Sequence, residues 1–156
     1  MNKDEQKKIT AKLDKFDEWY KKERGIISKM RDKYQKEYVQ VKAIALSELK
    51  IEFIDKQDEY AMATTGMKKY QFELERVAKD VEYNERLKLR KDGNTLDECK
   101  YKSWIHASPY HMLALRAEIC HDKARDLKNM VRDYKDEIIQ RISIVKGEEF
   151  NARQPH

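Results

Sequence analysis

The stretch from Leu113 to Val145 constrains the fold most, because its apolar residues recur at alternating spacings of four and three. This is the heptad pattern of a helix that packs along a single seam, and only Arg141 interrupts it with a polar side chain. The pattern predicts a long C-terminal coiled-coil helix. We expect its seam to be the oligomerisation surface, made of Leu113, Ala117, Cys120, Ala124, Leu127, Val131, Tyr134 and Ile138.

The composition favours the same class of fold along the whole chain. Charged residues and hydrophobic residues each make up 40% of the 156 residues, and there are only 4 glycines and 2 prolines. Such a chain forms long helices that bury a narrow seam and leave the rest solvated. We therefore predict an all-α fold, an elongated helical bundle in one domain spanning 1–156. Because little apolar surface is available for a thick core, we also expect a homo-oligomer.

Helix-breaking and helix-capping residues predict where the helices end. Gly25, the Thr64–Gly66 segment and the Ser108-Pro109 pair are expected to interrupt the periodic runs, and Gly93 to close one of them. Thr95 and Glu98 form a capping-box pattern at the start of a helix. The expected helices are 3–24, 26–63, 67–91, 96–107 and 109–146. The second is expected to pack through Ile27, Met30, Tyr34, Val41, Ile44 and Ile51.

No pattern typical of a catalytic site, a metal site or a cofactor site is present. Cysteines and histidines lack metal-binding spacing, and there is no glycine-rich phosphate loop. We therefore expect no enzyme activity, no catalytic residues, no metal and no cofactor. No apolar run is long enough to cross a membrane, and the N-terminus lacks the apolar region of a signal peptide. A cytoplasmic protein without membrane contact and with free thiols is expected.

Basic and aromatic residues gather between the predicted third and last helices. Cations follow phosphates and aromatic rings stack on bases, so such a mixture is typical of single-strand binding. The predicted nucleic-acid-binding residues are Arg86, Lys88, Arg90, Lys91, Lys100, Tyr101, Lys102 and Trp104. The alternative interpretation is that Trp104 fills the corner between two helices and the lysines are merely solvated. A second, weaker set of cations lies off the seam of the last helix: Arg116, Lys123, Lys128, Lys135 and Lys146.

The long C-terminal helix ends in the Ile- and Arg-rich stretch "IIQRISIVKGEEF" at 138–150, and it follows a charged first helix and a lysine-rich middle. In these features the chain resembles the UvsY-type recombination mediators and related small helical phage proteins. The resemblance implies a homo-oligomer in the host cytoplasm that binds single-stranded DNA. It also implies that this oligomer assists the loading of a recombinase onto strands covered by a single-strand binding protein. The alternative is a structural or protein-binding coiled coil, such as a virion-assembly scaffold or chaperone, without nucleic-acid binding.

Overall fold

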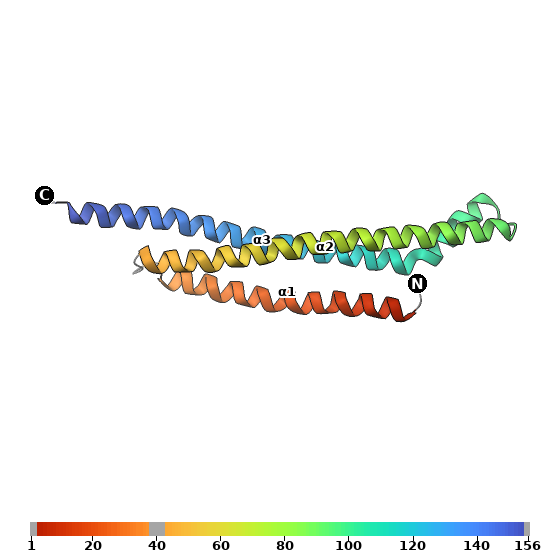
Figure 1. Ribbon diagram of the computed structural model, residues 1–156, viewed down its shortest axis with the longest axis horizontal. Helices are drawn as coiled ribbons and strands as arrows, with labels where there is room; N and C mark the ends of the chain where they lie inside the picture. Colours follow the sequence, from red (N-terminus) through yellow and green to blue (C-terminus); the bar gives the residue numbers. More distant parts are fainter. Residues whose placement is uncertain (1–2, 38–42, 155–156) are drawn as a thin grey trace. The chain divides into compact units, whose positions relative to one another are not determined.

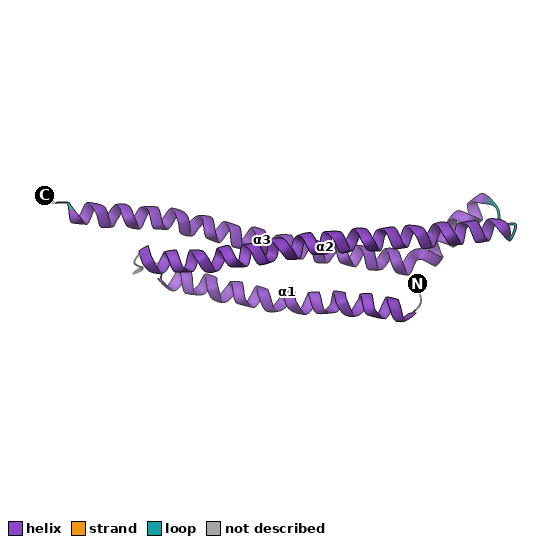
Figure 2. Ribbon diagram, in the orientation of Figure 1, coloured by secondary structure: helices purple, strands orange, loops and turns teal. Residues whose placement is uncertain are grey.

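The protein is built from three helices, α1 (Lys3–Glu37), α2 (Ala43–Lys91) and α3 (Leu96–Arg153). The computed structural model describes residues 3–37 and 43–154 (Figure 1). No strand occurs within these ranges, as the colouring by secondary structure shows (Figure 2). The predicted all-α class with a long C-terminal helix is therefore confirmed.

The prediction of one helix over 26–63 is wrong, because the chain reverses between α1 and α2. Lys56 Nζ lies 2.9 Å from Glu23 Oε2, although the two residues are 33 positions apart. In a straight helix that separation would span about 50 Å. The predicted seam residue Val41 lies outside the described residues.

The interruptions predicted at Gly25, Gly66 and Pro109 are also wrong, since all three lie inside helices, and the last helix continues past 146 to Arg153. A glycine costs a helix about 1 kcal/mol and an internal proline about 3 kcal/mol. Buried residues lie on both sides of Gly25, Gly66 and Pro109, and their packing outweighs the local preference there. In Figure 1 the first turns of α3 run at an angle to the rest of the helix, as expected near a proline.

The turn between α2 and α3 is formed as the sequence predicts. Gly93 has a φ of 88°, the left-handed conformation that ends α2. The capping box is confirmed in both directions. The Glu98 backbone N–H donates to Thr95 Oγ1 at 3.3 Å, and the Thr95 N–H donates to Glu98 Oε2 at 3.3 Å.

The described chain comprises two compact units, and each helix contributes one stretch to each of them. Unit 1 holds residues 3–19 and 64–123, and unit 2 holds 20–37, 43–63 and 124–154. The core of unit 1 joins all three helices through Leu13, Met67, Leu74, Ala114, Ala117 and Cys120. Small residues, including Ala78 and Ala107, make up much of its buried surface. That the chain is one domain over 1–156 stays a prediction.

Unit 2 buries larger side chains around a polar contact. Its fully buried residues include Ile27, Leu46, Leu49, Phe53, Tyr60, Leu127, Val131 and Ile138. The Tyr60 hydroxyl donates to Glu23 Oε2 at 2.7 Å, and Glu23 is itself buried. Burial, followed by this hydrogen bond and the negative charge of Glu23, raises the pKa of Tyr60 well above its ordinary value. The contact joins α1 to α2 inside the unit.

Candidate nucleic-acid interface

The α2–α3 tip, defined here as residues 86–106, is the part of unit 1 that contains the predicted nucleic-acid-binding residues. Contacts of α1 with α2 are found well before the tip: Lys12 Nζ lies 3.7 Å from the centre of the Tyr70 ring, and Ile9 lines a hollow with Val77. Figure 1 shows the α2–α3 hairpin extending past the first turn of α1. With only two helices present, more of each helix surface faces solvent.

The predicted aromatic residues of the tip lie on its surface. Tyr101 is 68% exposed and Trp104 is 56% exposed, while Cys99, Ser103 and Ala107 of the same helix are buried. Small side chains therefore fill the contact of α3 with α2 at this level. Trp104 does not fill the corner between the helices, so that part of the alternative interpretation is wrong. Both rings present accessible faces.

The predicted cations of the tip fall into two groups. Lys88, Arg90, Lys91 and Lys100 are exposed and form no ion pair within the described part of the chain. Lys102 donates a hydrogen bond to Asn94 Oδ1 at 2.9 Å, and Arg86 pairs with Glu82 at 3.3 Å. The tip therefore carries positive charge that the protein itself does not neutralise.

Two histidine–carboxylate contacts hold α3 against α2 beside the tip. His111 Nε2 lies 3.0 Å from Glu82 Oε2, and His106 Nε2 lies 3.7 Å from Glu85 Oε2. The sequence interpretation did not identify these contacts, because no local spacing relates the glutamates of α2 to the histidines of α3. They join the two helices of the hairpin that presents the tip.

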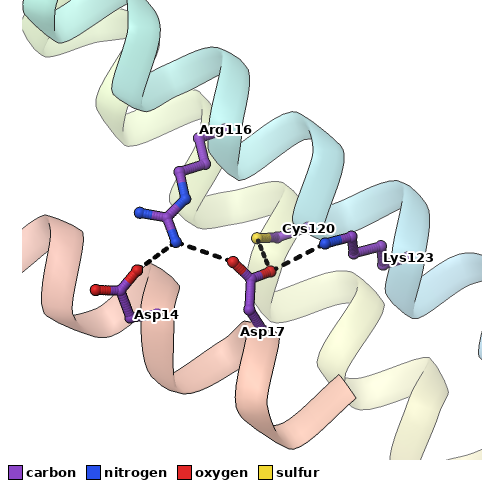
Figure 3. Close-up of polar contacts among 5 residues, drawn as sticks. All are labelled: Asp14, Asp17, Arg116, Cys120 and Lys123. Atoms are coloured by element: carbon purple, nitrogen blue, oxygen red, sulfur yellow. Dashed lines mark hydrogen bonds and ion pairs between the residues drawn. The ribbon is translucent and has the colours of Figure 1, made fainter. Parts of the chain in front are cut away.

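A polar cluster joins α1 to α3 in unit 1 (Figure 3). Arg116 donates to Asp14 and, at 2.9 Å, to Asp17 Oδ2, while Lys123 Nζ donates to Asp17 Oδ1 at 3.1 Å. Burial of Asp17 acts to raise its pKa, but the hydrogen bonds from Arg116 and Lys123 outweigh it and hold the pKa below its ordinary value. Arg116 and Lys123 thus form ion pairs within the described part of the protein, unlike the four exposed cations of the tip, Lys88, Arg90, Lys91 and Lys100.

The cysteine in this cluster has the environment of a structural thiol. Cys120 is buried, and its Sγ lies 3.7 Å from Asp17 Oδ1. Burial first, and then the charge of Asp17, raises the pKa of the Cys120 thiol to about 11. A thiol that stays protonated at neutral pH is a weak nucleophile.

The predicted oligomerisation seam packs inside the chain. Leu113 and Tyr134 are half-buried, and the other members are buried: Ala117, Cys120, Ala124, Leu127, Val131 and Ile138. These side chains are already covered by the protein's own helices, so this seam is not free to contact a second copy. A different row of α3, the α3 stripe, is exposed instead: Tyr101, Ile105, Met112, Leu115 and Ile119.

Within 3–37 and 43–154, no group of histidine, cysteine, aspartate and glutamate side chains is arranged to hold a metal ion. No helix in these ranges combines the length and apolarity that a membrane span requires. The resemblance to UvsY-type mediators stays a prediction. No family model matches the chain, and no significant match is found among curated proteins or solved structures.

Proposed function

We propose that this protein is a non-enzymatic accessory of DNA metabolism that binds single-stranded DNA through the α2–α3 tip. One observation carries the proposal: Tyr101 and Trp104 are exposed beside cations that have no acidic partner in the described structure. Exposed rings offer stacking faces for bases of any identity, and unpaired cations offer sites for phosphates. Loading of a recombinase onto strands covered by a single-strand binding protein is the role that the resemblance to recombination mediators supports.

The test is single-strand binding as a function of salt concentration. Arg90, Lys91, Lys100 and Lys102 are replaced together by alanine. Each phosphate contact contributes a slope of roughly 0.7 to the log–log salt dependence, so the slope should fall by about 3. Affinity at low salt should fall strongly as well.

Trp104→Ala separates stacking from charge. It should weaken binding by roughly 1 to 3 kcal/mol with little change in the salt slope, because stacking releases no counterions. A matched control replaces exposed lysines of α1 that lie in unit 2 and form no ion pair there: Lys21, Lys22, Lys29 and Lys33. It changes the net charge equally. If the tip variant retains the affinity and slope of this control, the proposal is wrong.

The α3 stripe favours a second candidate function, that of a protein-binding coiled coil such as a scaffold or chaperone. Its residues are separated by four, seven, three and four positions, which matches a heptad seam with Ser108 at the missing position. Large apolar side chains exposed in such a row are typical of a contact with another helix. Self-association is therefore proposed through this stripe. Met112→Glu with Leu115→Glu should lower the light-scattering mass while leaving strand binding by the tip intact.

A further inference from the structure

We infer that the outer face of α2 is a second segment of the nucleic-acid site, which continues from the tip along the helix. The segment, called the α2 track, consists of Lys68, Lys69, Phe72, Arg76, Lys79, Tyr83, Leu87 and Arg90. The inference rests on the proposed function, because it concerns the same strand and the same chemistry. Arg90 belongs to both the tip and the track, so the two surfaces are continuous.

Helix geometry places the track on one face of α2. From Phe72 to Arg90 its members follow one another at spacings of three and four, which return to the same side of a helix. The opposite side contains Met67, Leu74 and Ala78, which are buried. The track therefore faces away from the core of unit 1.

Large apolar side chains distinguish the track from an ordinary solvated face. Phe72 is 55% exposed, Tyr83 is 60% exposed and Leu87 is 45% exposed. A solvated helix face usually carries interspersed charges of both signs and few such side chains. Here two aromatic rings lie exposed about 16 Å apart along the axis, at a rise of 1.5 Å per residue.

The charges on this face are mostly positive and are not neutralised by the protein. Lys69, Arg76, Lys79 and Arg90 are exposed, and none of them forms an ion pair within the described ranges. The acids Glu75, Asp80, Glu82 and Glu73 flank this face, about 60°, 80°, 80° and 100° around the helix from Phe72. A polyanion following the track would thus meet cations on both sides of each ring.

A hollow near the start of the track adds a place for a stacked base. It is lined by Thr64, Thr65, Lys68, Lys69, Phe72 and His121. Lys68 Nζ lies 4.9 Å from the centre of the Phe72 ring, so a cation already contacts the aromatic face. A nucleotide entering here would find a ring, a hydroxyl and two ammonium groups within one depression.

The α3 stripe differs from the track in chemistry. Apart from Tyr101, which it shares with the tip, its members Ile105, Met112, Leu115 and Ile119 are all apolar, and this suits a protein surface better than a phosphate backbone. The track combines rings with cations, and these are the two components of a sequence-independent single-strand site. Its length from Lys68 to Arg90 is about 33 Å at the helical rise.

The length of the track leads to a test that uses strands of two sizes. An oligothymidylate of about 8 nucleotides can occupy the tip alone, whereas one of about 20 nucleotides can also follow the track. The track variant carries Lys69→Ala, Arg76→Ala and Lys79→Ala, changes that favour helix and leave the fold intact. It should bind the short strand as the wild type does and bind the long strand more weakly, with the salt slope reduced by about 2.

A separate variant tests the aromatic residues of the track. Phe72→Ala with Tyr83→Ala should weaken binding of the long strand by about 5- to 150-fold for each stacked base lost, with an unchanged salt slope. The matched control for charge is Lys21→Ala, Lys22→Ala and Lys29→Ala in α1. Circular dichroism confirms that each variant keeps its helicity.

The outcomes separate this inference from the proposed function. If the track variants bind both strands as the control does while the tip variant loses binding, the inference about the track is wrong and the proposed function of the tip is supported. If the tip variant binds normally and the track variant binds the long strand more weakly, the inference about the track is supported and the proposed role of the tip is wrong. If the wild type binds neither strand, both are overturned.

Discussion

Removing one hydroxyl from unit 2 tests whether the buried contact between Tyr60 and Glu23 stabilises the fold. Tyr60 is fully buried, and its hydroxyl donates to Glu23 Oε2 at 2.7 Å. Tyr60→Phe keeps the ring and deletes only the donor, so the acceptor retains Lys56 but loses one partner. A hydrogen bond to a charged group contributes about 1.5 to 3 kcal/mol, and we expect the free energy of unfolding to fall by that amount.

The assay is denaturant unfolding followed by circular dichroism, with Tyr101→Phe as the matched control. Tyr101 is exposed and forms no hydrogen bond in the described structure, so its change should stay within about 0.5 kcal/mol. A loss for Tyr60→Phe no larger than that of the control would refute the argument that this contact stabilises unit 2.

The same variant has a predicted pH signature. The pKa of Tyr60 is raised in the folded state, by burial first and then by Glu23, so the unfolded chain releases the phenolic proton first. Stability should therefore be unaffected below pH about 10 and should fall as the pH rises above it. Lys56 contributes in the same direction: although its burial acts to lower its pKa, its hydrogen bonds to Glu23 and Glu59 raise it overall. Tyr60→Phe should remove the tyrosine part of the alkaline loss and keep the lysine part.

Four other features give further predictions. The pKa of Asp17 is lowered in the folded state, so Asp17 contributes stability above its unfolded pKa near 3.8, and this contribution is lost as the pH falls. The difference in free energy of unfolding between wild type and Asp17→Asn should therefore shrink below pH about 4. A constant difference across an acid titration would contradict this. Thr95→Ala should lower the free energy of unfolding by about 0.5 to 2 kcal/mol, whereas Thr95→Ser should not. Gly93→Ala should cost about 1 to 2 kcal/mol because of its positive φ, and an unchanged urea midpoint would exclude that strain. Cys120, with a pKa of about 11 and little exposure, should react with a thiol reagent at neutral pH only after unfolding; immediate labelling would show that the thiol is accessible.

Local signals in the sequence are sufficient to predict the helix ends at the tip and the buried face of α3. The capping box at Thr95 and the left-handed Gly93 depend only on residues within about one turn. The seam through Ala117, Leu127 and Ile138 depends on periodicity along one helix. Such features do not require knowledge of the partner helix, which is why they were predicted correctly.

The packing of residues 43–63 was not predictable in the same way. The sequence pattern predicts one helix over 26–63 with a seam through Ile27, Tyr34 and Ile51, and so it predicts that Ile51 is buried. Ile51 is 56% exposed, whereas Phe53 and Tyr60 are buried. Because α2 is a new helix that returns along α1, its phase is set by tertiary contacts and not by the preceding residues.

The composition of the tip was predictable, but its exposure was not. The sequence shows that cations and aromatics are adjacent, yet whether Trp104 faces solvent depends on which small residues fill the contact between α2 and α3. The contacts of Glu82 with His111 and of Glu85 with His106 depend on the register of the hairpin. That register arises from tertiary packing, so spacing within either helix does not reveal it.

The small residues on the buried side of α3 in unit 1 determine how far the sequence can diverge without loss of the fold. Ala107, Ala114 and Ala117 are almost fully buried, so a larger side chain at these positions has no space unless the helices separate. Overpacking of this kind typically costs about 1 to 3 kcal/mol at each site. Members of this lineage should therefore vary freely along the solvent faces of the helices, but they should retain alanine, glycine or serine along this narrow strip.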